Sequence, residues 1–320
     1  MKDIVLGIDI GGTFTKYGFI DKDGKSLLES SIETTGHNEI EKYLTTLANA
    51  CKKSFSSLGS DFNLVGVGIG APNGNYYNGT IEYAPNLDWK DVVPFVDLFK
   101  KHFHLPMALT NDANAAAIGE MMYGGAKELK NFVVITLGTG LGSGIVVNGE
   151  VVYGHDGFAG EAGHVLVYEN GRMCGCGKRG CLETYASASG IRRTVFELLC
   201  DETTPSVLRD ASYNNLTAKM ISKAAKEGDP IAIMAFEFTG KILGMKLADT
   251  VAHTSPEVIF LFGGLTNAGE ILFKPTKEHF EYNLLKIYRN KIKILPSGLQ
   301  ETNAAVLGAS ALAWKELEKY

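Results

Sequence analysis

Long hydrophobic runs and charge of one sign are both missing from this 320-residue sequence. No apolar run approaches the roughly 18 residues that a bilayer crossing needs, and the most apolar helical stretch, 231–252, is interrupted by charged residues such as Lys241. The formal net charge of -5 argues against nucleic acid or an anionic membrane as the main partner. The start at Met1 leads directly into a strand-like run, so no signal peptide is expected. We therefore expect a cytoplasmic protein, large enough for two domains.

Cysteine is also scarce, with five residues, and three of these lie in one short glycine-rich segment. Cys174, Cys176 and Cys181 follow His164, and glycines separate all four side chains. One imidazole and three thiolates form the ligand set of a closed, structural zinc site. The alternative is three unrelated cysteines in a loop, but core cysteines sit in apolar runs instead. The segment therefore predicts bound Zn²⁺, which would also fix the flanking acids Glu161 and Glu183 in space.

Two stretches of the chain share one pattern of apolar strand, glycine-threonine turn and second strand. The first runs from 4 to 20 and turns at Gly11-Gly12-Thr13, and the second runs from 131 to 149 and turns at Gly138-Thr139-Gly140. Free backbone N–H groups in such turns can bind an anion, and Asp9 is placed to hold Mg²⁺ through water beside the first turn. A plain hairpin would explain either turn alone. The pair predicts two similar lobes that together bind a nucleoside triphosphate.

An acidic residue stands where a predicted strand meets a strong helix. The strand 106–110 is followed by Asn111-Asp112, and the helix is expected over 113–122. Asp112 is either the helix cap, the commoner role of such an Asp, or a catalytic base that the helix dipole keeps ionised. Because a cap needs only one of the two side chains, the pair favours catalysis.

The remaining elements alternate between strand and helix. Gly263-Gly264 ends a buried strand and allows a close approach to a base or ribose. Asn73 and Asn86 are loop amides that follow strands, and most such residues only form turns. Periodicity predicts helices over 37–58, 186–199, 216–227, 231–252 and 303–319, and strands over 64–69, 258–262 and 293–295.

Together these motifs resemble the ROK family of sugar kinases and repressors over essentially the whole chain. The most specific match is Glu161-x-Gly163-His164 with Cys174-x-Cys176-x-x-x-x-Cys181-x-Glu183. The resemblance implies an α/β, two-lobed actin-like (ribonuclease-H-like) ATPase fold with an interlobe cleft. The expected lobes are 1–112 with 303–320, and 113–302, which carries the zinc loop.

The resemblance also implies roles for individual residues. It makes Asp112 the catalytic base for transfer of a phosphoryl group from ATP to a hexose, with glucose expected first. A homodimer is expected, and the absence of a DNA-binding domain ahead of the first strand resembles the kinase branch of the family. The implied nucleotide ligands are Asp9, Gly11, Gly12, Thr13, Lys16, Thr139, Gly140, Gly263 and Gly264, and the implied sugar ligands are Asn73, Asn111, Asp112, Glu161, His164 and Glu183.

Other functions remain open from the sequence. An N-acetylmannosamine or N-acetylglucosamine kinase would need a differently shaped sugar pocket, which the motifs do not reveal. A sugar-sensing regulator without turnover is opposed by Asp112 and by both glycine turns. A catalytic zinc hydrolase is opposed by a fourth protein ligand, which leaves no open position on the metal.

Overall fold

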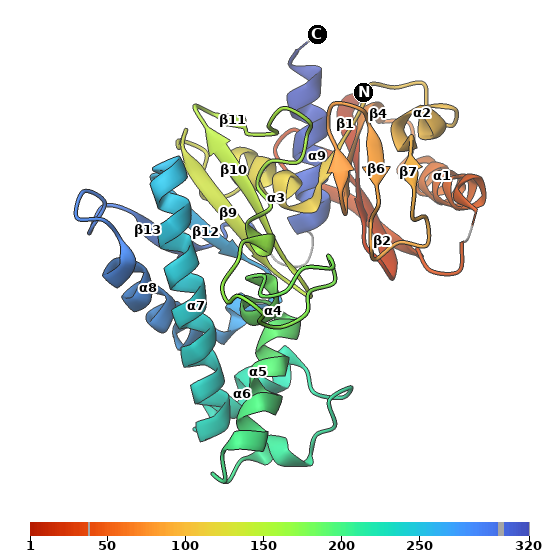
Figure 1. Ribbon diagram of the computed structural model, residues 1–320. Coiled ribbons are helices and arrows are strands. Elements are labelled where there is room, and N and C mark those ends of the chain that lie inside the picture. The colour runs from red at the N-terminus through yellow and green to blue at the C-terminus, as the bar shows by residue number, and fades with distance from the viewer. Residues whose placement is uncertain (38, 300–303, 320) are drawn as a thin grey trace. The chain divides into compact units, whose positions relative to one another are not determined.

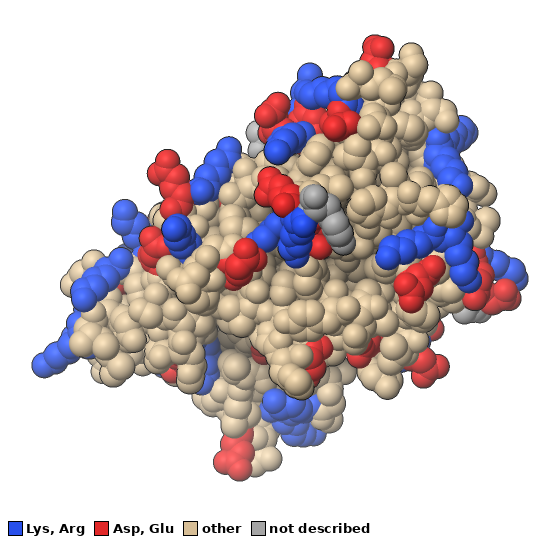
Figure 2. All heavy atoms as spheres, turned by 90° about the horizontal axis from the view of Figure 1, so that it is seen from above, with Lys and Arg blue, Asp and Glu red and all other residues tan. Residues whose placement is uncertain are grey.

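The computed structural model describes residues 1–37, 39–299 and 304–319. The chain forms two compact units, Met1–Leu129 with Val151–Ala159 and Gly298–Tyr320, and Lys130–Glu150 with Gly160–Ser297. None of the helices in the described part of the chain has both the length and the apolar character that a bilayer crossing requires. On the face drawn in Figure 2, Lys and Arg side chains are interspersed with Asp and Glu.

The first unit is built on a five-stranded sheet of order β3-β2-β1-β4-β8 (Figure 1). β1 pairs antiparallel with β2 and parallel with β4, which in turn pairs parallel with β8. A small three-stranded sheet, β5-β6-β7, follows β4 in the chain. The elements of this unit are β1 (Lys2–Ile10), β2 (Phe14–Asp21), β3 (Ser26–Glu33), α1 (Ile40–Ser57), β4 (Phe62–Ala71), β5 (Gly74–Asn75), β6 (Thr80–Glu82), β7 (Val92–Val93), α2 (Phe95–Lys100), β8 (Met107–Asn111), α3 (Asp112–Met122) and α9 (Ala304–Leu317).

Both faces of the first sheet are covered by helices. Alternate β1 side chains, from Ile4 to Ile10, form one apolar cluster with α1 residues such as Leu47 and α2 residues such as Phe99. The opposite face approaches α9 so closely that a Cβ added at Gly68 would lie 1.8 Å from the carbonyl oxygen of Ala309. Glycine in these strands therefore sets the separation between sheet and helix.

The second unit repeats this topology with the order β11-β10-β9-β12-β13. β9 pairs antiparallel with β10 and parallel with β12, as β1 does with β2 and β4. The prediction of two similar lobes from the repeated strand–turn–strand pattern is thus confirmed. The elements are β9 (Phe132–Leu137), β10 (Leu141–Val147), β11 (Glu150–Val151), η1 (Ala162–His164), α4 (Glu183–Ala186), α5 (Ala188–Asp201), η2 (Val207–Asp210), α6 (Ala218–Lys226), α7 (Pro230–Thr254), β12 (Val258–Phe262), η3 (Gly264–Ala268), α8 (Glu270–Asn283) and β13 (Lys293–Pro296).

The boundary of the first unit differs from the expected one. Helix α3, which we assigned to the second lobe, belongs to the first unit, which continues to Leu129. It packs along α9, where a Cβ added at Gly308 would lie 2.5 Å from the carbonyl oxygen of Ala115. The expected start of the last helix and of the returning segment at Asn303 lies outside the described residues.

Candidate active site and metal cluster

Two carboxylates lie at the carboxyl edge of the first sheet. In the sheet, Asp9 on β1 pairs with Gly70 on β4, and Gly70 pairs with Thr110 on β8. Asn111 and Asp112 directly follow Thr110 in the chain. A Cβ added at Gly70 would lie 3.8 Å from Asp9 Oδ1 and 3.9 Å from the Cα of Asp112. Parallel strands thus bring the two acids to the two sides of one glycine, which leaves the space between them open.

Electrostatics at this edge favours a bound cation. Burial, and to a smaller extent the nearby Asp112, raise the pKa of Asp9 to about 7, against the opposing effect of Lys16. Asp112 is exposed at the protein surface. Desolvation by the surrounding protein nevertheless raises the pKa of its carboxyl above the usual range, and hydrogen bonds from backbone N–H groups partly oppose this shift. Two partly desolvated carboxylates of like charge form a donor set that suits a hard divalent ion such as Mg²⁺.

The helix cap at this edge is Asn111, and Asp112 has a different environment. Asn111 Oδ1 accepts a hydrogen bond from the backbone N–H of Asn114 at 2.7 Å. The Asp112 carboxylate accepts one from the N–H of the next residue, Ala113, at 2.9 Å. The capping role that the sequence left open for Asp112 is therefore filled by its neighbour.

The first glycine turn lies beside the same edge. Gly11 donates its N–H to the carbonyl of Phe14 at 3.1 Å, and Thr13 accepts from the N–H of Thr34 at 2.8 Å. A Cβ added at Gly12 would lie 2.8 Å from the carbonyl oxygen of Asn86, so only glycine fits there. Lys16 lies directly across from Asp9 in the β1–β2 ladder, which explains its influence on that carboxyl.

The Asn73 side chain is engaged with the backbone of its own unit. Its amide nitrogen donates to the carbonyl oxygens of Glu82, at 2.9 Å, and Tyr83, at 3.4 Å. Asn73 and Tyr83 both have positive φ, at 50° and 51°, so these hydrogen bonds hold two strained positions together. The Asn73 side chain therefore stabilises the conformation of its loop. Its contact with a sugar remains a prediction.

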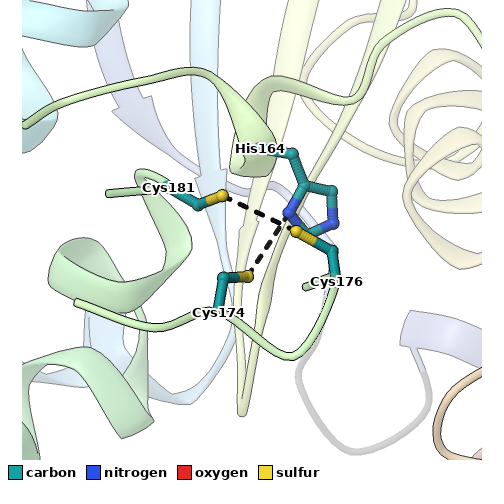
Figure 3. A group of neighbouring side chains, drawn as sticks. All are labelled: His164, Cys174, Cys176 and Cys181. Carbon is teal, nitrogen blue, oxygen red and sulfur yellow. Dashed lines mark hydrogen bonds between the residues drawn. The ribbon is translucent and has the colours of Figure 1, made fainter. Parts of the chain in front are cut away.

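The four predicted metal ligands meet in the second unit (Figure 3). The ligand atoms of His164, Cys174, Cys176 and Cys181 all lie within 4.8 Å of one another. Two pairs are separated by 3.7 Å, Cys174 Sγ from His164 Nδ1 and Cys176 Sγ from Cys181 Sγ. A tetrahedral zinc with Zn–S bonds of about 2.3 Å would separate its sulfurs by about 3.8 Å. The cluster therefore has nearly the dimensions of a closed zinc site.

The thiols themselves also favour a bound cation. Burial raises the pKa of Cys174 to about 12, and burial raises that of Cys181 as well. The pKa of Cys176 is lowered instead, because hydrogen bonds from the backbone N–H of Lys178 and from the neighbouring thiols outweigh burial. A divalent soft cation displaces the protons that the thiols of Cys174 and Cys181 retain. The residues present thus fit Zn²⁺.

The two flanking acids have different surroundings. Glu161 Oε2 lies 3.9 Å from His164 Nε2, the ring nitrogen that faces away from Cys174. Glu183 Oε2 accepts the N–H of Leu141 at 3.0 Å, and its Oε1 lies 3.5 Å from Cys174 Sγ. One acid therefore lies beside the imidazole, and the other lies between the metal cluster and the start of β10.

The second glycine turn and Gly263-Gly264 are neighbours on the second sheet. β12 and β9 run parallel, with Phe262 paired to Thr136. A Cβ added at Gly263, whose φ is 108°, would lie 2.7 Å from the carbonyl oxygen of Leu137, next to the turn. Around Gly138 and Gly264 there is no other atom of the described residues within 4 Å of such a Cβ. The strand ends therefore present open backbone, as a bound nucleotide would require.

Sequence reasoning did not identify two contributors to these sites. Gly70, which separates Asp9 from Asp112, carries only the general signal of a glycine inside a strand. Asn86, which abuts Gly12, was noted only as a loop amide. Neither role was visible without the pairing of distant segments.

Comparison with known proteins decides the family. The family model described as ROK family matches residues 5–316. This chain belongs to the ROK family. Among ROK proteins, it is 39% identical to a glucokinase from Halalkalibacterium halodurans over 86% of this chain and 84% of that protein. It is 34% identical to a glucokinase from Thermotoga maritima over 96% of both chains.

A solved ROK structure agrees with the fold. The ROK glucokinase from Streptomyces griseus, solved with glucose and AMPPNP, superposes with a TM-score of 0.82 at 31% identity, covering 98% of this chain and 99% of that one. The expected actin-like α/β architecture of the ROK family is thus confirmed for this chain.

Proposed function

We propose that this protein is a sugar kinase that transfers the γ-phosphoryl group of ATP to a hexose, with glucose as the preferred acceptor. The observation that carries the proposal is Asp112, an exposed carboxylate at the carboxyl edge of the first sheet. Asn111 caps the helix, so Asp112 is left for chemistry. The ROK glucokinases to which this chain is similar over most of its length support the choice of glucose.

Asp112 is proposed as the general base. Its pKa is raised by its partly desolvated surroundings, and a base whose pKa is closer to neutral accepts a proton more readily in the transition state. It would take the proton of the attacking hydroxyl, by analogy the 6-OH, as that oxygen attacks the γ-phosphorus. Positioning and charge neutralisation should supply most of the rate enhancement, and the base a smaller share.

Each glycine turn is proposed as a phosphate-binding element for the nucleotide. Backbone N–H groups of Gly12 and Thr13 in the first unit, and of Thr139 and Gly140 in the second, would donate to its phosphates. Asp9 would hold the accompanying Mg²⁺ through water, and Lys16 would balance the local charge. Bound Mg²⁺ would neutralise charge on the β- and γ-phosphate oxygens. Gly11 shapes the first turn, and Gly263 and Gly264 leave room for the nucleoside.

The residues that the family resemblance implies are proposed as the hexose ligands. Asn111 and Asp112 would bind the sugar in the first unit, with Asn73 in the adjoining loop. In the second unit, Glu161, His164 and Glu183 would contact ring hydroxyls. Bound Zn²⁺ would be structural, held by His164, Cys174, Cys176 and Cys181. With Nδ1 turned to the metal, His164 keeps Nε2–H as a donor of fixed direction beside Glu161.

Substrate choice is tested by a panel of hexoses, including N-acetylmannosamine and N-acetylglucosamine, with ATP and Mg²⁺ in a coupled assay for ADP release. We expect glucose to give the highest kcat/KM. Sugar binding without ADP release would contradict the kinase proposal and favour a sensor. Two further expectations have separate tests. Light scattering of the same preparation tests the expected homodimer, and fractionation of cells tests the expected cytoplasmic location.

The base is tested by Asp112→Asn. Turnover should fall by about 10² to 10⁴, while the dissociation constant for glucose changes by less than about threefold because the isosteric amide keeps most contacts. Asp97→Asn is a matched control, since Asp97 is another exposed Asp in the first turn of a helix of the same unit. A variant Asp112→Asn that keeps more than about a tenth of the turnover would exclude Asp112 as the base.

A further inference from the structure

The second glycine turn is held on both sides by residues next to the metal ligands. Leu141, the first residue after the turn, donates its N–H to Glu183 Oε2 at 3.0 Å. Its carbonyl oxygen lies against Gly163, where an added Cβ would be only 2.1 Å away. Gly163 directly precedes the ligand His164, and Glu183 follows the ligand Cys181 by two residues. Both ends of the metal-binding segment therefore contact Leu141, the residue that directly follows the turn.

The segment after Glu183 contacts the turn as well. The N–H of Ala188 donates to the carbonyl of Gly138 at 2.9 Å. Ser189 Oγ donates to the carbonyl of Thr139 at 2.7 Å. The backbone on both sides of Gly140 is thus bonded to the region from 183 to 189. A Cβ added at Gly140 itself would lie 2.4 Å from Glu183 Oε2, which shows how closely the carboxylate fits beneath the turn.

The metal ligands in turn hold Glu183. Its Oε1 lies 3.5 Å from the sulfur of Cys174. Thr184, the next residue, donates through Oγ1 to the carbonyl of Cys181 at 2.7 Å. The orientation of Glu183 therefore depends on two of the four ligands being in place.

A separate anchor keeps the base of the metal-binding segment in place without a metal. Arg172 donates from Nε to Glu197, from one terminal nitrogen to the carbonyls of Thr184 and Gly190, and from the other to Glu197 and Thr194. Its guanidinium also lies 4.5 Å from the centre of the Tyr185 ring. Metal loss should therefore loosen the ligand loop and the turn while the rest of the second unit stays folded.

We infer that the Cys₃His cluster positions the second phosphate-binding turn, with Glu183 as the positioning residue that connects them, so that metal loss weakens nucleotide binding even when no sugar is present. The inference rests on the proposed function, since it assumes that the turn binds a nucleotide. A glycine turn that must be ordered on binding loses affinity through conformational entropy. Ordering the backbone of about one turn residue corresponds to a loss of about tenfold.

The first experiment compares zinc-loaded and chelator-stripped protein without sugar. Calorimetry with AMPPNP and Mg²⁺ should give a dissociation constant about tenfold higher for the stripped protein. Hydrogen exchange should accelerate in 138–142 and stay unchanged in α7 and β12, which would show that the unit remains folded. Cys176→Ser should behave like the stripped protein. Cys200→Ser, an exposed cysteine of α5 outside the cluster, should behave like the loaded one.

The second experiment uses Glu183 itself, again without sugar. Glu183→Ala removes the acceptor of the Leu141 N–H and should weaken AMPPNP binding about tenfold. Glu183→Gln keeps an oxygen that can accept this hydrogen bond, so its AMPPNP affinity should stay within about threefold of the parent. A purely structural carboxylate would not separate the two variants in this way.

The two failures can be told apart. If zinc-loaded parent protein binds no nucleotide, the proposed function is overturned and this inference with it. If it binds nucleotide, and neither metal removal nor Glu183→Ala alters the affinity or the exchange of 138–142, the inference alone is overturned.

Discussion

Replacing Asp9 tests how far its buried carboxyl group lowers the free energy of unfolding of the protein. Its pKa is raised from 3.8 to about 7 by burial, with Asp112 adding to the effect. A carboxyl with a raised folded-state pKa favours the protonated state. The buried carboxyl therefore does not lower the free energy of unfolding below pH 4, where it is protonated in both states. It lowers the free energy of unfolding progressively as the pH rises to about 7. Replacing Asp9 with the neutral, isosteric Asn should remove this effect.

The magnitude follows from the shift. A difference of about 3 pKa units at about 1.4 kcal/mol per unit gives an upper limit of about 4 kcal/mol at pH 8. At pH 5 the folded carboxyl is already protonated and the unfolded one is mostly ionised, so the penalty is only about 1.5 kcal/mol. Asp9→Asn should thus stabilise the protein more at pH 8 than at pH 5, by about 2 to 3 kcal/mol at most.

The assay is denaturant unfolding of parent and variant at both pH values, without Mg²⁺ or nucleotide. Added Mg²⁺ and AMPPNP should stabilise the parent more than the variant, because Asp9 is the proposed ligand of the ion. An equal effect of the substitution at both pH values, or no stabilisation at pH 8, would refute the origin that we assign to the raised pKa. Asp3→Asn, an exposed Asp on the same strand, should show no such pH dependence.

Two further substitutions test the second unit. Gly140→Ala places a Cβ 2.4 Å from Glu183 Oε2, so AMPPNP affinity should fall at least about tenfold, whereas Gly175→Ala, which has open space around its Cβ, should leave it unchanged. Equal affinities in calorimetry would show that the turn tolerates the shift. Arg172→Met removes every hydrogen bond of a side chain that is only 9% exposed and should lower the free energy of unfolding by about 3 kcal/mol. Arg179→Met, which loses one bond of 3.3 Å to Gly171, should change it by less than about 0.5 kcal/mol, and similar denaturation midpoints for the two variants would contradict this role.

Local patterns predicted the long elements well and missed the atypical ones. Helix α7 over Pro230–Thr254 and strand β12 over Val258–Phe262 lie close to the expected ranges because both carry strong apolar signals. Helix α8 was not predicted, and Pro275 lies inside it. It packs against glycines of α7, where a Cβ added at Gly244 would lie 2.3 Å from the carbonyl oxygen of Thr276. Tertiary packing therefore outweighs the local cost of that proline.

The candidate sites divide in the same way. The metal ligands are close in sequence, and turn chemistry alone was enough to group them before any contact was known. The partnership of Asp9 and Asp112 joins residues far apart in the chain, and it depends on the order β1-β4-β8. The roles of Asn111 as cap and of Gly70 as spacer follow from that arrangement and could not be read from spacing.

The sequence by itself determined the family, the repeated strand–turn–strand architecture and the ligand quartet, because each is encoded in short segments whose glycines, threonines and cysteines have few alternative uses. Only the tertiary structure decided that α3 belongs to the first unit, that Glu183 supports Leu141 and that two acids share the space left by Gly70. These outcomes depend on which distant segments pack together. Hydrogen bonding and close packing between segments select that arrangement, and no local pattern records it.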